Sequence, residues 1–117
     1  MKKIDSPTII KSIGNKPKLI EEYVGKVNSN TESISIAKMN APPNWKEPGQ
    51  KPKFDEYTVV LKGSLKVESQ NKAYFVKKGE TIIVQAGEWV RYSTTNKGAE
   101  YIAICIPAFS LETVNRD

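Results

Sequence analysis

The residues that could do chemistry in this chain are carboxylates, tyrosines and one cysteine, because the sequence contains no histidine. Without histidine, Ser-His-Asp and Cys-His catalysis, histidine-based zinc sites and an imidazole base near pH 7 are all excluded. Cys105 is the only cysteine, so no internal disulfide can form, and no sequence neighbour would stabilise its thiolate. We therefore predict that Cys105 is a small core residue in a cytoplasmic protein.

The composition is that of one globular domain. With 117 residues, of which 38% are hydrophobic and 26% charged, the chain can build a single core but not two. The net charge of +5 could suggest an anionic partner, but the lysines are scattered rather than gathered in one run. We predict no nucleic-acid partner and, because no long apolar run is present, no signal peptide and no membrane segment.

Short strands separated by turns dominate the chain from residue 54 to residue 109. Alternating apolar and polar residues are typical of half-buried strands, and hairpin-sized gaps favour a closed or double-sheet antiparallel architecture. An edge strand is predicted over residues 6–13 and another strand over 33–39, before a proline-rich loop. The later strands are predicted at YTVVLK, SLKVE, AYFVK, ETIIV, WVRYST and AEYIAICI, with turns at Gly63 and at Asn96 to Gly98.

One short helix is predicted in the segment PKLIEEYVGKV. Its apolar residues recur at helical spacing, Pro17 suits the first turn of a helix, and Gly25 suits its C-terminal cap.

Two glycine spacings resemble the cupin family, whose motifs are G(X)5HXH(X)3,4E(X)6G and G(X)5PXG(X)2H(X)3N. Glu56, six residues and Gly63 match the end of the first motif. Gly79, five residues and the run Gln85 to Gly87 match the start of the second, with Gln85 in place of proline. The resemblance covers residues 33–109. It implies an all-β fold, a cupin-type double-stranded β-helix (jelly-roll) barrel with one short N-terminal helix, as a single domain over residues 1–117.

The metal ligands of the family are largely missing. The first two histidine positions fall near Gln50 and Pro52, or near Gly49 and Lys51 in the other spacing, the third falls on Val90, and the final asparagine position is Thr94. Only Glu56 remains of the four ligands, and one carboxylate holds a transition metal poorly. We predict no metal and no cofactor. An all-oxygen site for magnesium, manganese or calcium, built from Glu47, Glu56 and Gln50, stays open.

Strand alternation predicts which side chains line the barrel. If Glu56 points inward, Thr58 shares its face, and if Val90 points inward, so do Tyr92 and Thr94. On the last strand, the face of Tyr101, Ala103 and Cys105 is the smaller and more polar one. The predicted ligand-binding residues are Gln50, Glu56, Thr58, Val90, Tyr92, Thr94, Cys105 and Trp45.

Two residues of this set have a second interpretation. Trp45 either closes the barrel mouth over a ligand or packs in the core or a dimer interface, and Glu56 either contacts a ligand or serves only as a hydrogen-bonded structural group.

Two functions are compatible with these residues. The first is a metal-free cupin barrel that binds a small organic ligand, with an anion favoured by the basic chain. The second is a metal-independent isomerase or lyase acting on a sugar-like or carboxylate substrate, with Glu56 as general base and Tyr92 or Tyr101 as acid. The second function requires burial to raise the pKa of Glu56 towards neutrality.

A homodimer is also predicted. Trp89 and Arg91 should project outward, opposite Val90, and with outward isoleucines they would leave a lone barrel partly apolar on its surface. For Arg91 itself, a surface or interface ion pair is expected.

Overall fold

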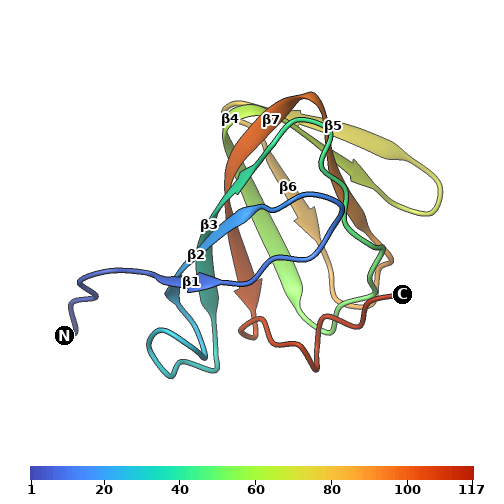
Figure 1. The fold of residues 1–117 in the computed structure, drawn as a ribbon. Helices are drawn as coiled ribbons and strands as arrows, with labels where there is room; N and C mark the ends of the chain where they lie inside the picture. The colour runs from blue at the N-terminus through green and yellow to red at the C-terminus, as the bar shows by residue number, and fades with distance from the viewer.

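The computed structural model describes residues 1–117 and contains seven strands and no helix. No helix is therefore present that could cross a membrane. Figure 1 shows the longer strands β4 and β7 curving round to enclose a barrel, with β1 and β2 crossing in front of it. The strands are β1 (Thr8–Ile10), β2 (Leu19–Val24), β3 (Ser35–Ala41), β4 (Asp55–Glu68), β5 (Ala73–Lys77), β6 (Thr81–Val84) and β7 (Arg91–Ile106).

All neighbouring strands pair antiparallel, in the order β1-β2-β3-β7-β4-β5, with β6 also paired to β4. The first half of β4 lies between β7 and β6, and its second half lies between β7 and β5. In the same way, β7 pairs with β4 along its length but with β3 only from Ala99 onwards. Each of the two long strands therefore has different neighbours along its two halves, so that both strands belong to two sheet layers. The predicted all-β barrel is confirmed.

The predicted turns at Gly63 and at Asn96 to Gly98 are wrong. β4 and β7 continue through both sites, and Gly63 pairs with Ala99 between two register shifts. Gly63 has a φ of 75°, and a Cβ added to it would lie 1.9 Å from the carbonyl oxygen of Gly98. Glycine here permits a bend with close backbone approach, whereas the sequence pattern alone resembles a chain reversal.

The predicted short N-terminal helix is also wrong, because its residues form β2. Pairing with β1 on one side and β3 on the other satisfies the backbone groups that a helix would have bonded internally. The buried carboxylate of Glu22, on β2, accepts hydrogen bonds from the backbone amides of Val27 and Asn28, which follow this strand, at 3.1 and 2.8 Å. Tertiary pairing here overrides the local helical spacing.

The other predicted elements agree with the structure. β1 is the edge strand, β3 matches the predicted strand at 33–39, and the proline-rich segment is a loop. The last residues are more than a tail, because they pair with that loop. Lys51 and Lys53 donate backbone hydrogen bonds to the carbonyls of Asn115 and Thr113, at 2.9 and 2.8 Å, and thereby hold the C-terminal segment against one end of the barrel.

The core consists of two groups of buried side chains. The larger group contains Trp45, Leu65 and Tyr101 among eleven residues, and the smaller group contains Phe54, Cys105 and Val114. The predicted alternation on β7 is confirmed, because Tyr101, Ala103 and Cys105 are buried while the intervening isoleucines are more exposed.

The outward side chains are also as predicted. Arg91 makes a bidentate pair with Glu68 at 2.9 and 3.2 Å, which confirms the expected surface ion pair. The half-buried Trp89 donates to the carboxylate of Asp117 at 3.0 Å.

Replacing Gly63 tests the bend. Gly63→Ala should lower the free energy of unfolding by at least about 2 kcal/mol, because it adds left-handed strain and a clash with the Gly98 carbonyl. Gly79→Ala is the matched control, since Gly79 has a φ of 84° but open space around it. Chemical denaturation of both variants measures the difference. Equal losses in the two variants would show that the close approach contributes nothing.

Candidate ligand-binding cavity

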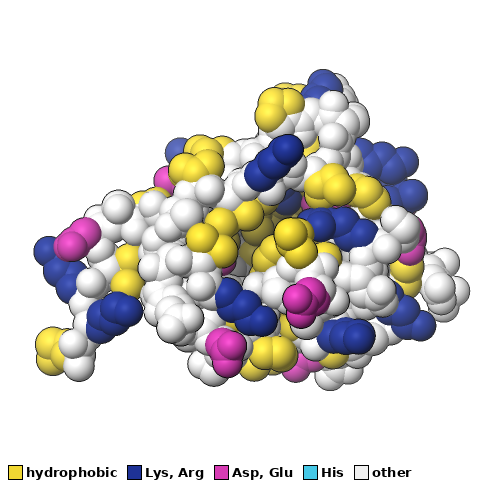
Figure 2. Space-filling view, turned by 60° about the horizontal axis from the view of Figure 1, so that its bottom comes forward, with side chains coloured by type: hydrophobic (Ala, Val, Ile, Leu, Met, Phe, Trp, Pro, Cys, Tyr) yellow, Lys and Arg dark blue, Asp and Glu magenta, His cyan; other side chains and the backbone are white.

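A cavity of about 470 Å³ lies inside the barrel and touches both core groups. This volume is typical of small-molecule sites. Figure 2 shows hydrophobic side chains gathered around a hollow on one face, with basic and acidic side chains around them. The apolar part of the wall comes from β1, β2, β3, β7 and the segments that follow β1 and β7: Ile10, Ile13, Ile20, Ala37, Met39, Ala103, Phe109 and Leu111.

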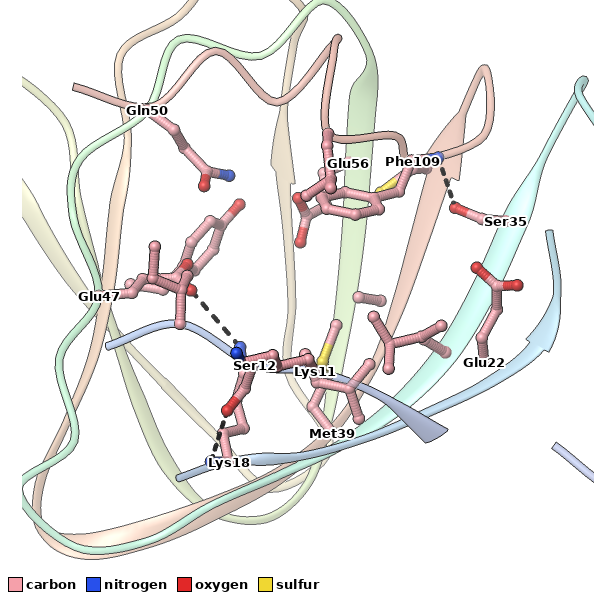
Figure 3. A pocket seen from close by; sticks show the side chains of 18 of the residues that line it. Lys11, Ser12, Lys18, Glu22, Ser35, Met39, Glu47, Gln50, Glu56 and Phe109 are labelled. Atoms are coloured by element: carbon pink, nitrogen blue, oxygen red, sulfur yellow. Dashed lines mark hydrogen bonds and ion pairs between the residues drawn. The ribbon is translucent and has the colours of Figure 1, made fainter. Parts of the chain in front are cut away.

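A set of polar side chains shares this cavity. Figure 3 shows Gln50, Glu47 and Glu56 converging on the same space, with Lys18 entering from the segment before β2. Such a combination of apolar walls and a few polar groups is the usual composition of a ligand site. The polar lining residues discussed below are Lys18, Glu47, Gln50, Glu56, Tyr92, Tyr101 and Arg116.

Lys18 and Glu47 form a buried ion pair, with 3.6 Å between Nζ and Oε2. The Lys18 ammonium also donates to the Tyr101 hydroxyl at 3.2 Å and lies 4.1 Å from the centroid of the Trp45 ring. Burial lowers the pKa of Lys18 and raises the pKa of Glu47, and their mutual attraction partly offsets both changes. Pairing is therefore what makes two charges tolerable in this position.

Glu56 lies on β4 with only 9% of its surface exposed. Burial raises its pKa from 4.5 to about 7, and the nearby Glu47 carboxylate adds to the rise, while Lys18 opposes it. The hydroxyls of Thr58 and Tyr92 also lower this pKa from beside the carboxyl, but neither hydroxyl makes a hydrogen bond of good geometry. Glu56 can therefore both take and release a proton near neutral pH.

Three polar groups of the cavity wall can donate hydrogen bonds: the hydroxyls of Tyr92 and Tyr101 and the Nε of Arg116. Burial raises the pKa of the Tyr92 and Tyr101 hydroxyls well above its usual value, so both keep their protons. The Tyr92 hydroxyl has no hydrogen-bond partner, and neither has the buried Nε of Arg116. Buried donors without partners are rare in folded proteins, so these two indicate a place for a polar ligand group.

Four of the predicted ligand-binding residues line the cavity: Gln50, Glu56, Tyr92 and Cys105. Tyr101, predicted as a candidate acid, lines it too. Burial, with Glu56 nearby, raises the pKa of the Cys105 thiol, as expected of an unreactive core residue.

The other four predicted residues do not line the cavity. Trp45 and Val90 are fully enclosed in the larger core group, so Trp45 does not close the barrel mouth. Thr94 pins the proline-rich loop instead, because its hydroxyl donates to the Pro42 carbonyl at 2.6 Å and accepts from the Trp45 amide at 2.9 Å. Thr58 is buried beside Glu56 and reaches the site only through that carboxyl.

Four charged residues that line the cavity were not predicted: Lys11, Lys18, Glu22 and Arg116. Lys18 could have been found if residues 18–24 had been interpreted as a strand, because alternation then places Lys18, Ile20 and Glu22 on one face, and all three line the cavity. Arg116 has no such signal, because it belongs to an irregular C-terminal segment that shows no periodicity.

The donors present do not fit the metal of the cupin motif. Val90 stands at one ligand position with an aliphatic side chain in the core, and Pro52 or Lys51 stands at another. No group of three or more His, Cys, Asp and Glu side chains lies close enough together to hold a metal ion. Glu47 does reach the cavity, but Lys18 pairs with it.

Three comparisons relate the chain to known proteins. No protein-family model matches the sequence. A curated relative, endoribonuclease YbeY of Myxococcus xanthus (strain DK1622), is 40% identical over 101 residues, which are 86% of this chain but 34% of that protein. The chain therefore spans about a third of the length of the curated relative it matches.

Solved structures establish the fold. The polyketide cyclase RemF of Streptomyces resistomycificus matches with a TM-score of 0.73 and 16% identity, over 97% of this chain and 89% of that one. A cupin-like protein from Thermotoga maritima matches with a TM-score of 0.75 and 12% identity, over 88% and 79%. A predicted oxalate decarboxylase from the same organism matches with a TM-score of 0.72 and 21% identity, over 87% and 92%. At these identities the likeness concerns the fold alone, and it is a cupin-type β-barrel.

The raised pKa of Glu56 makes stability depend on pH. A carboxyl whose folded pKa exceeds its unfolded value stabilises the fold below the unfolded pKa and loses that contribution as pH rises through the folded pKa. Relative to Glu56→Gln, the wild type should lose about 3 kcal/mol of unfolding free energy between pH 4.5 and pH 7, which follows from the rise from 4.5 to about 7.

Urea denaturation over this pH range measures the difference between the two proteins. The exposed Glu32 provides the matched control, and Glu32→Gln should follow the wild type. A constant difference between wild type and Glu56→Gln at all pH values would contradict the raised pKa.

Proposed function

From this cupin-type barrel and the cavity inside it, we propose that the protein binds a small organic ligand without a metal, and that the ligand has an apolar body and an anionic group. The observation that carries the proposal is the pairing of apolar walls with two unsatisfied donors, Arg116 Nε and the Tyr92 hydroxyl. The match to the curated relative covers only 34% of that protein, so its activity is not assigned to this chain.

The charges support an anion. Among the charged lining residues, Lys18 and Glu47 satisfy each other, the Glu22 carboxylate accepts from two backbone amides, and Lys11 is exposed. The Arg116 guanidinium and a Glu56 carboxyl that is about half protonated near neutral pH remain. A ligand carboxylate would accept from Arg116 and from Tyr92, and it would remove the cost of two buried donors without partners. Its apolar body would replace water against the isoleucine, methionine and phenylalanine side chains of the wall.

A second candidate function is catalytic. A metal-independent isomerase or lyase acting on a sugar-like or carboxylate substrate would use Glu56 as general base and Tyr92 or Tyr101 as acid. The pKa of about 7 for Glu56 favours this function, because an efficient base titrates near the working pH, and the two tyrosines hold protons to donate. Glu56→Gln separates the two functions, since it would abolish turnover while a binding protein would keep its affinity.

RNA cleavage, which the name of the curated relative states for that protein, is not extended to this chain. On the face seen in Figure 2, lysines and arginines alternate with acidic and apolar side chains and form no continuous basic patch. We therefore keep a small molecule as the partner, with no nucleic acid and no membrane. The buried thiol of Cys105 fits the cytoplasmic location that we propose.

A thermal-shift assay tests the ligand class. We expect 3-phenylpropanoate, an apolar body with a carboxylate, to raise Tm, and the corresponding alcohol 3-phenylpropanol to raise it less. At a hundred times its Kd, the carboxylate should stabilise the fold by about 2.7 kcal/mol. Prior treatment with EDTA should change nothing, and elemental analysis should find no stoichiometric transition metal.

Arg116→Gln should lose most of this shift, because it removes the free guanidinium. Arg91→Gln is the matched control, since Arg91 lies outside the cavity in its pair with Glu68. Equal shifts in the two variants, or equal shifts by the acid and the alcohol, would refute the anion preference. Loss of binding after EDTA would refute the metal-free site.

We also propose a homodimer. Tyr74, Phe75 and Ile83 are each about half exposed and line an outer groove with Trp89 along β5 and β6. Light scattering at micromolar concentration should give twice the 13.1 kDa of one chain. Ile83→Lys places a charge in the groove and should shift the protein towards monomer. A wild-type mass of one chain would exclude the dimer.

A further inference from the structure

Lys18 is the only buried lysine of the chain. It stands directly before β2, and its backbone amide donates to the Ser12 hydroxyl at 3.0 Å, which ties it to the segment crossing the cavity after β1. Figure 3 shows this bond and the Lys18 side chain reaching Glu47. The side chain is therefore fixed at the cavity wall rather than free in solvent.

The contacts of the Lys18 amine orient it for chemistry. Nζ donates to the Tyr101 hydroxyl, lies 3.6 Å from Glu47 Oε2 and packs 4.1 Å from the Trp45 ring centroid. One neighbour can thus accept a proton and another can donate one, while Lys18 still forms part of the cavity lining. Burial also lowers the pKa of this amine, which increases the neutral fraction that acts as a nucleophile.

We propose that Lys18 is a covalent site for carbonyl compounds: its amine condenses with the aldehyde or ketone group of a small apolar ligand in the cavity and forms an imine. The proposal rests on the ligand cavity described above and adds a bond to it. A buried amine between a carboxylate and a phenol, at the wall of an apolar cavity, has the surroundings that imine formation requires.

The atoms balance without any oxidant or reductant. Glu47 takes one proton from the ammonium, and the neutral Nζ then attacks the carbonyl carbon. A C–N bond forms, the C=O π bond breaks, and a proton from the nitrogen passes to the oxygen, with the Tyr101 hydroxyl beside it. The C–O bond then breaks, the oxygen leaves as water with the proton held by Glu47, and the nitrogen lone pair completes a protonated imine.

Reductive trapping tests the proposal. Phenylpyruvate supplies a ketone, a carboxylate and an apolar body, and sodium cyanoborohydride converts its imine to a stable secondary amine. We expect one adduct per chain in the intact mass, located at Lys18 by peptide mapping. It should form faster at pH 7 than an adduct at any exposed lysine, because burial lowers the pKa of the Lys18 amine.

Lys18→Arg should remove this adduct, because a guanidinium forms no comparable imine, and circular dichroism verifies its fold. Lys38→Arg is the matched control, since the half-buried Lys38 pairs with Glu100 and does not line the cavity. Labelling of the wild type that is slower at Lys18 than at the exposed lysines, or absent, would overturn the inference. If 3-phenylpropanoate still raises Tm in that case, the binding function survives and only the covalent step fails.

Discussion

The close approach of two backbones at Gly63 and Gly98 is the constraint on which the rest of the barrel depends. β4 and β7 can belong to both sheet layers only if they bend where Gly63 pairs with Ala99. The left-handed φ of Gly63, together with its missing Cβ, makes that bend possible. From Ala99 to the end of β7, this strand lies between β3 and β4. Before Ala99, β7 pairs with β4, and β4 in turn pairs with β5. A cavity between the layers exists because neither long strand continues straight.

The polar end of that cavity is governed by desolvation. Lys18, Glu47, Glu56 and Arg116 are among the charged side chains that line this cavity, and burial disfavours the charged form of each group that it encloses. Lys18 and Glu47 reduce this cost by forming an ion pair, while Glu56, which forms no ion pair, has its pKa raised to about 7. Burial is the main cause of this rise, and the Glu47 charge adds to it.

Much of the fold could be predicted because period-two alternation is a direct consequence of strand geometry. It placed Glu56, Tyr101 and Cys105 on inward faces, as the structure has them. Residues 17–25 satisfied helical spacing as well, and only pairing with distant strands decided between the two conformations. Gly63 was misjudged for a related reason, since a bend and a turn both require glycine, and only the opposite strand distinguishes them.

The candidate site was less predictable than the fold, because it is assembled from segments far apart in the chain. The charges of this site would also make the binding of an anion depend on pH. An anion held by Arg116 would add a negative potential near Glu56 and raise the pKa of that carboxyl further, so binding near pH 7 would be accompanied by proton uptake. By reciprocity, lowering the pH through this range would strengthen the binding of the anion. Once Glu56 is protonated, the charges of Lys18 and Glu47 cancel, as do those of Lys11 and Glu22, and Arg116 gives the cavity lining a net positive charge. Under the proposed function, this charge balance would favour an acid without the help of a metal.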